Sequence, residues 1–209
     1  MKIFSRIFEK RILSAKCVEG DCEDGFGTMV FTNGSTYIGQ FRHALFHGHG
    51  IFASTDGSRY QGMFKKGKGH GQGTMQWPDG KKYSGEFRKG KGHGHGTLTH
   101  GDGRQYIGGF KKGIAQGQGC LIYSNGKKYI GQFRRGRFHG QGIFTSPQGY
   151  QYEGQWKNDR FHGIGIVTLP GGGTYKGNWK NDTFISDISS SPGKRKTNSR
   201  PLPDRPDLA

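Results

Sequence analysis

Apolar and polar residues alternate with a period of two in short stretches that recur at a fixed interval along this chain. Tyrosines stand every 23 residues, and each is followed by Gly two positions later and by Phe or Trp two positions after that. The tyrosines are Tyr37, Tyr60, Tyr83, Tyr106, Tyr129, Tyr152 and Tyr175. Side chains at i, i+2 and i+4 lie on one face of a β-strand. A fixed period of this length is typical of a repeat array, so each copy predicts one strand.

A second run, His-Gly-x-Gly-x-apolar, follows each of these strands after a short basic loop. Its last column is apolar in every copy: Met29, Phe52, Met75, Leu98, Leu121, Phe144 and Val167. Asn-Gly or Asp-Gly pairs such as Asp56-Gly57 then precede the next Tyr, and these dipeptides are typical of tight hairpin turns. The pattern predicts an all-β fold, an elongated single-layer antiparallel meander with one hairpin per repeat. We interpret the Gly between the two aromatic residues as space for a side chain of a neighbouring strand.

The combined motif Tyr-x-Gly-x-Phe/Trp-x-x-Gly-x-x-His-Gly-x-Gly resembles the MORN (membrane occupation and recognition nexus) repeat over roughly residues 25–184. Phe stands where the family often has Trp in the first five repeats, and Gln116 replaces His in the fourth. The resemblance implies a gently twisted single sheet with an aromatic-lined groove. It also implies a role as a membrane-associated tether, a scaffold or an appendage of an enzyme.

Composition divides the chain into three segments. Residues 1–16 predict a short amphipathic basic helix, because Ile3, Phe4, Ile7 and Phe8 fall on one side of it. Capping of the array, anchoring in a membrane interface and organelle targeting all stay open for this helix. Residues 17–185 form the repeat array, and residues 186–209 predict a disordered basic tail rich in Ser and Pro. No stretch approaches the ~20 apolar residues that a transmembrane helix requires.

The two ends of the array depart from the repeat. Residues 24–34 are expected to form a half repeat whose first strand is missing, and residues 175–180 are expected to be the last strand. Cys17 and Cys22 stand five positions apart. Reduced structural thiols, a small disulfide ring and half of a metal site are the alternatives for this pair.

Positive charge is concentrated at one place in the repeat. The chain has 32 Lys and Arg against 15 Asp and Glu, a formal net charge of +17. The residue after each strand aromatic is basic, and the loop that follows adds further bases, so the cations should line one edge of the sheet. We name these residues as candidates for anion or lipid binding: Arg42, Lys65, Lys66, Lys68, Arg88, Lys89, Lys91, Lys111, Lys112, Arg134, Arg135, Arg137, Lys157, Arg160 and Lys180. The candidate groove aromatics are Tyr60, Phe64, Tyr83, Phe87, Tyr106, Phe110, Tyr129 and Phe133.

The sequence motifs predict neither a catalytic site nor a metal site. Histidines recur with the repeat, but equivalent positions in successive hairpins stand ~9.5 Å apart, too far to share one zinc ion. We therefore expect no enzymatic activity, no metal and no cofactor. The expected function is a scaffold that binds a protein partner or itself, and the alternative is a peripheral module that binds anionic phospholipid through the basic edge. Nucleic acid should bind only nonspecifically. The expected location is cytoplasmic, with peripheral attachment to a membrane as an option.

Overall fold

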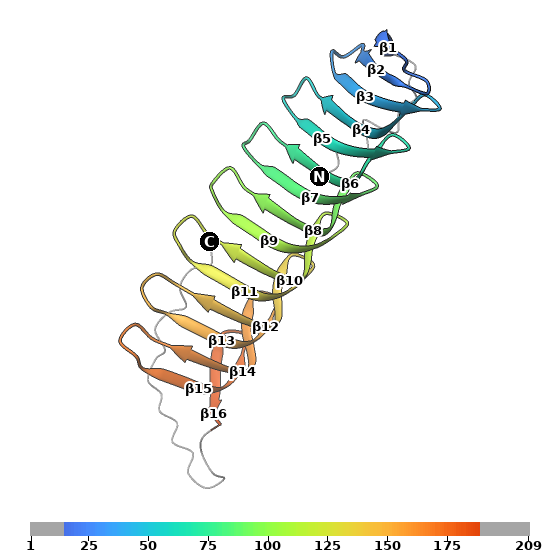
Figure 1. Cartoon of the computed structure of the whole chain (residues 1–209). Helices are drawn as coiled ribbons and strands as arrows, with labels where there is room; N and C mark the ends of the chain where they lie inside the picture. The colour runs from blue at the N-terminus through green and yellow to red at the C-terminus, as the bar shows by residue number, and fades with distance from the viewer. Residues whose placement is uncertain (1–14, 189–209) are drawn as a thin grey trace. The chain divides into compact units, whose positions relative to one another are not determined.

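The computed structural model describes residues 15–188, which form an antiparallel meander of 16 strands (Figure 1). Each strand pairs with the next one in the chain, so the order in the sheet is the order in the sequence. Within residues 15–188, no helix has the length and apolarity that crossing a bilayer requires. The strands are β1 (Ala15–Gly20), β2 (Phe26–Phe31), β3 (Thr36–Arg42), β4 (Leu45–Ala53), β5 (Arg59–Lys65), β6 (Lys68–Gln76), β7 (Lys82–Arg88), β8 (Lys91–Thr99), β9 (Gln105–Lys111), β10 (Ile114–Ile122), β11 (Lys128–Arg134), β12 (Arg137–Thr145), β13 (Gln151–Lys157), β14 (Arg160–Thr168), β15 (Thr174–Lys180) and β16 (Thr183–Asp187).

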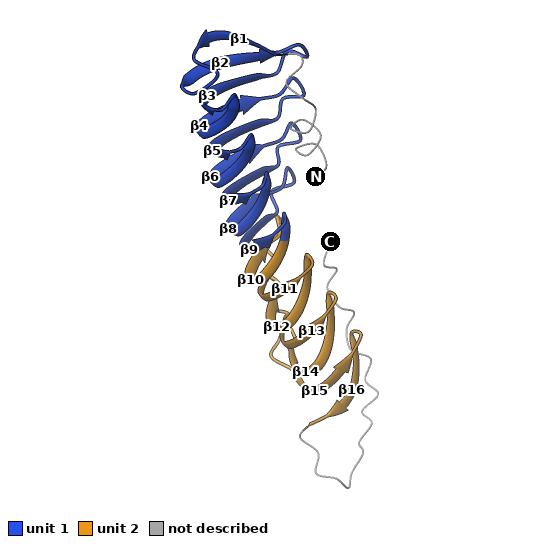
Figure 2. Cartoon of the chain, turned by 90° about the vertical axis from the view of Figure 1, so that its right-hand side faces the viewer, with its two compact units in different colours: residues 1–114 blue, residues 115–209 orange. Residues whose placement is uncertain are grey.

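The chain divides into two compact units, residues 1–114 and residues 115–209 (Figure 2). Strands β1 to β9 belong to unit 1, and β11 to β16 belong to unit 2, together with all of β10 except its first residue. Each unit is a succession of hairpins of the same design.

Each hairpin from β3 to β14 joins a seven-residue strand to a nine-residue strand, as in β5 and β6. The pairing passes from Gly62 opposite Gly73 to Phe64 opposite Gly69, so Met63 lies opposite the segment 70–72. This bulge accounts for the unequal lengths of the two strands. Burial alternates along the short strand: in β3, Tyr37, Gly39 and Phe41 are buried and the residues between them are exposed. The sheet therefore has a core face, which carries the aromatic columns, and an open face.

Tight turns lie at the Asn-Gly and Asp-Gly pairs, as the sequence predicted, and also at the basic edge of the sheet. Lys66 and Gly67 connect β5 to β6 with φ of +51° and +74°, the two-residue geometry that suits twisted antiparallel strands. Asp56-Gly57 lies in a three-residue hairpin loop. There the Gly57 amide donates to the Ser54 carbonyl (3.0 Å), and the Ser54 amide donates to the Ser58 carbonyl (2.8 Å). An Asx-Gly pair suits both turn types, so it could not distinguish between them.

The glycines between the aromatic residues make room for a tyrosine ring of the same hairpin. Gly131 lies opposite Gly142, and a Cβ added at Gly142 would collide with the ring and hydroxyl of Tyr129. The Tyr129 hydroxyl reaches over these glycines and donates to the Gln132 carbonyl (2.9 Å). We had expected a side chain of a neighbouring strand to fill the space at this glycine. That expectation is wrong, because Tyr129 and Gly131 belong to the same strand, β11.

The core is a continuous row of edge-to-face aromatic contacts within each unit. In unit 1 the Tyr60 ring lies 4.9 Å from the rings of Phe64 and Phe87, and the Tyr83 ring lies 4.9 Å from the rings of Phe87 and Phe110. Tyr60 and Tyr83 thus each contact the aromatic residue of their own repeat and that of the next repeat. These contacts join neighbouring hairpins into one core.

The ends of the array differ from the expectation. The helix predicted for residues 1–16 is wrong where the structure describes it, since Ala15 and Lys16 belong to β1, and residues 1–14 lie outside the described residues. Strand β1 pairs with β2, so the first hairpin has both strands. Strand β16 pairs with β15, so the sheet continues one strand beyond Lys180. Ser186 and Asp187 belong to this strand, and the rest of the predicted disordered tail from residue 189 lies outside the described residues. Neither outer strand carries the repeat motif, but each covers the backbone groups of a strand that would otherwise form an edge.

Candidate functional site

The fifteen candidate cations lie at the turns between short and long strands, along one edge of each unit. Arg42, Lys65, Arg88 and Lys111 are the last residues of β3, β5, β7 and β9 in unit 1. Arg134, Lys157 and Lys180 end β11, β13 and β15 in unit 2. We call the fifteen together the basic rim. All are exposed except Lys68, which is half-buried.

Backbone hydrogen bonds link successive turns of the rim. In unit 1 the Gly90 amide donates to the Gly69 carbonyl (2.8 Å), and the Gly113 amide donates to the Gly92 carbonyl (2.7 Å). In unit 2 the Asp159 amide donates to the Phe138 carbonyl (3.1 Å). The main chain that carries the cations is therefore held at a regular spacing, while their side chains extend into solvent.

Acidic residues neutralise little of the rim. Between residues 15 and 188, one rim cation forms an ion pair: Arg137 Nε lies 3.9 Å from Asp159 Oδ2. The other oxygen of Asp159 accepts a hydrogen bond from the Phe138 amide (2.8 Å). In unit 2, Arg137, Lys157 and Arg160 line a hollow of about 300 Å³. A second hollow, of about 380 Å³, is lined by Arg134 and Lys157 together with His139 and His162. These sites suit an anion of small size or a charged surface.

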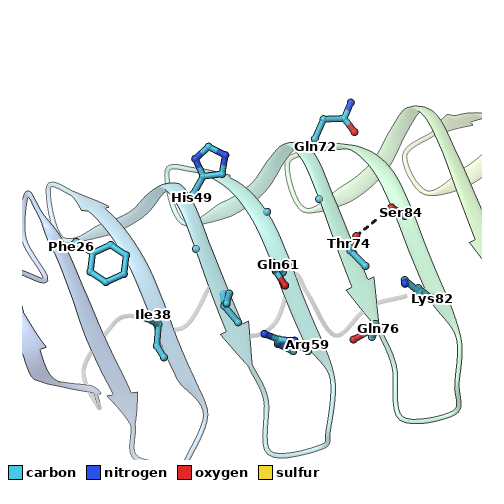
Figure 3. Close-up of a pocket in the computed structure, with 14 residues that line it drawn as sticks. Phe26, Ile38, His49, Arg59, Gln61, Gln72, Thr74, Gln76, Lys82 and Ser84 are labelled. Atoms are coloured by element: carbon cyan, nitrogen blue, oxygen red, sulfur yellow. Dashed lines mark hydrogen bonds between the residues drawn. The ribbon is translucent and has the colours of Figure 1, made fainter.

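The open face of unit 1 carries a larger groove that the sequence analysis did not identify. Its volume is about 740 Å³, and we call it the open-face groove. Figure 3 shows Phe26 and Ile38 toward one end of it and Gln76 and Lys82 toward the other. Arg59 and Lys82 contribute positive charge, and the described residues that line the groove include no Asp or Glu. The available signal was the residue between each Tyr and Gly, such as Ile38, which faces away from the core in every repeat.

The eight candidate groove aromatics are core residues, each at most 7% exposed. Burial raises the pKa of Tyr83 and of Tyr106 to about 12 because it disfavours the phenolate. A narrow cavity of about 130 Å³ remains on the core face of unit 1, lined by Tyr60, Trp77, Tyr83, Phe87, Leu98 and Phe110 among others. We call this cavity the aromatic groove.

The cysteine and histidine candidates have structural positions. Cys17 and Cys22 form a disulfide in the first hairpin, which decides among the three alternatives for this pair. Residues 15–188 contain no group of three or more His, Cys, Asp or Glu placed to hold a metal ion. Nδ1 of both His139 and His162 is buried with no hydrogen-bond partner in the described part of the chain.

Two solved structures align with this chain at low similarity. The SAS-4 (dCPAP) TCP domain of Drosophila melanogaster, in complex with a proline-rich motif of Ana2 (dSTIL), is 10% identical with a TM-score of 0.49 and covers 79% of this chain and 90% of that one. The TCP10 domain of Danio rerio CPAP, in complex with a peptide of STIL, is 15% identical with a TM-score of 0.29 and covers 74% of this chain and 84% of that one. Neither similarity bears on the function of this chain. No relative among curated proteins matches the sequence.

The family is established by the repeat itself. A model of the MORN repeat matches residues 23–36, 37–59, 60–82, 83–103, 106–128, 129–149 and 152–174. The matched segments cover most of the described sheet, and β1, β16 and all of β15 except Thr174 lie outside them. The motif, the hairpin architecture and the seven matches agree, and the chain belongs to the MORN repeat family.

Proposed function

We propose that this protein is a non-enzymatic scaffold that binds a protein partner in the open-face groove of unit 1. The observation that carries the proposal is the composition of that groove. Phe26 is 63% exposed and Ile38 is 43% exposed, so large apolar side chains lie on a face that the core does not use. Exposed apolar surface with a polar surround is typical of protein-interaction sites.

The chemistry of the groove indicates the kind of partner. Arg59 and Lys82 lack acidic neighbours among the described lining residues, so an acidic segment of a partner would gain charge-assisted hydrogen bonds there. Gln61, Gln72 and Gln76 supply both donors and acceptors. We therefore expect a partner segment that combines apolar side chains with Asp or Glu.

A photo-crosslinking experiment identifies the partner and tests the surface. A photoreactive amino acid at Gln72 should capture one protein that the same group at Asp102, in an Asx-Gly loop, does not capture. The purified candidate is then titrated against Arg59→Glu/Lys82→Glu and against Lys111→Glu/Lys112→Glu, which makes the same charge change on the rim. We expect binding to weaken by about tenfold or more with the groove variant only, because close charge pairs dominate such contacts. Equal losses with both variants, or no loss with the groove variant, would contradict the proposal.

A second candidate function is binding of anionic phospholipid by the basic rim. The exposure of the cations and the hydrogen-bonded turns that space them favour it. Each Lys or Arg near an anionic membrane contributes about 1 kcal/mol, so four or five acting together give measurable binding. The chain should co-sediment with phosphatidylserine-containing vesicles, less at high salt, and Lys111→Glu/Lys112→Glu should reduce the bound fraction. Equal binding to vesicles of phosphatidylcholine alone would eliminate this candidate.

A further inference from the structure

Three repeats place a phenyl ring flat against their tyrosine. The rings of Phe46, Phe138 and Phe161 each lie 3.7 Å from the ring of the repeat's Tyr, with the ring planes within 9° of parallel. Each of these residues is the second residue of a long strand, in β4, β12 and β14 respectively. The stacked phenyl is thus a regular part of the repeat at these three places.

Strands β6 and β8 have Gly at the same position, and the aromatic groove lies alongside them. Gly69 and Gly92 are the second residues of these strands. A Cβ added at Gly92 would lie 2.9 Å from Cζ of Tyr83, so a side chain starting there would pass over the tyrosine ring. Gly92, Tyr83 and Trp77 all line the aromatic groove. The second residue of β10 is Ala115, so three consecutive long strands lack the phenyl that β4, β12 and β14 supply. The aromatic groove lies beside the two of them that have Gly.

Residues 1–14 include phenylalanines, which could supply the absent phenyl ring. Ile3, Phe4, Ile7 and Phe8 are large apolar residues of this segment. Phe4 and Phe8 supply two phenyl rings.

The point at which this segment joins the sheet lies opposite a residue in the same column of the repeat as residues that line the aromatic groove. It joins the sheet at Ala15, which pairs with Phe31 beside the first Asx-Gly loop. Ser54 and Trp77 occupy the position of Phe31 in the next two repeats, and both line the aromatic groove. The middle of the groove, at β6 and β7, is five to six strand spacings from β1, about 24–28 Å. Fourteen residues span more than about 40 Å when extended, so the segment is long enough to reach the groove.

We propose that residues 1–14 bind in the aromatic groove of the same chain, with Phe4 or Phe8 over Tyr83 in the place of the absent phenyl. The groove carries Lys81 and Lys91, so charge does not favour this basic segment, and apolar burial drives the contact. Salt screens the repulsion between exposed cations. Occupancy should therefore hold or rise at high salt, whereas an acidic partner in the groove would bind less.

The test uses the full-length chain with a benzophenone amino acid at position 4 or 8. Irradiation should yield an intramolecular crosslink to groove residues, with Met75 the preferred acceptor because it lines the groove and has a reactive thioether. Mixing isotopically labelled and unlabelled chains distinguishes a crosslink within one chain from a crosslink between two copies. The yield should be unchanged or higher at high salt.

A variant that fills the groove provides the second arm. Gly69→Phe/Gly92→Phe restores the phenyls of the other repeats and should lower the crosslink yield about tenfold or more, the factor expected from the lost burial of one large apolar side chain. Thr97→Phe adds the same ring on the open face of β8, outside the open-face groove, and should leave the yield unchanged. Crosslinks outside the groove, crosslinks between copies, or a yield that the filled groove does not lower would overturn the proposal. Because no partner takes part and the groove lies on the core face, this result is independent of the proposed scaffold function.

Discussion

The stacked phenyl ring makes a strong prediction for the stability of unit 2. Phe161 is 2% exposed, and its ring lies 3.7 Å from the Tyr152 ring, 4.9 Å from Trp156 and 5.6 Å from Trp179. Truncating a buried Phe to Ala costs about 3–5 kcal/mol, since the transfer free energy is lost and a cavity is left. Three aromatic partners place Phe161→Ala toward the upper end of that range, because each ring pair adds about 0.5–1.5 kcal/mol.

Urea unfolding followed by tryptophan fluorescence measures this effect, because Trp156 and Trp179 both contact the deleted ring. A loss of about 4 kcal/mol lowers the midpoint by at least about 1 M for ordinary urea m-values. Ile164→Ala is the matched control: Ile164 lies on the same strand but is 54% exposed, so its truncation should change stability by no more than about 0.5 kcal/mol. If Phe161→Ala cost less than about 1 kcal/mol, or no more than the control, the stacked ring would not be the stabilising contact that the geometry indicates.

Three further predictions concern pH, the glycine columns and the rim. Burial raises the pKa of Tyr83 to about 12, above the value near 10 of an unfolded chain; stability should be constant below about pH 10 and fall toward about pH 12, as the unfolded state releases its protons first. Phenolate absorbance that is complete near pH 10 while the sheet stays folded would contradict this. Gly142→Ala should destabilise unit 2 by about 1–3 kcal/mol in urea, because the methyl meets Tyr129; an unchanged midpoint would refute the close packing. Asp159→Ala should cost about 1.5–3 kcal/mol through the lost hydrogen bond to Phe138, and Asp159→Asn should restore part of it; equal effects of the two substitutions would speak against that bond.

Much of the sheet could be predicted because the residue spacings that specify it are local and recur in every repeat. The Tyr-x-Gly-x-Phe stretch sets which side chains share a face, and the fixed interval aligns successive hairpins. The exposed cations at the ends of β5 and β7 follow from the same spacing, since every short strand ends at the same position of the repeat. Their role in binding anions remains a prediction.

Other features depended on contacts between residues whose pairing no local pattern specifies. The two-residue turn at Lys66-Gly67 and the bulge opposite Met63 both depend on how β5 pairs with β6. The open-face groove could not be predicted from the sequence. Residues such as Ile38 are isolated along the chain, and they come together only when neighbouring strands pair.

The sequence by itself determined the hairpin repeat, the alternation of core and open faces, and the edge on which the cations lie, because each depends on spacing within 23 residues. Tertiary structure decided that β1 and β16 extend the sheet, that Cys17 and Cys22 join, and that the two Gly positions in β6 and β8 coincide with a cavity. The physical reason is that these features arise from backbone pairing at strand edges and from which ring covers which tyrosine. Both are set by neighbours in space, and the sequence pattern specifies only neighbours along the chain.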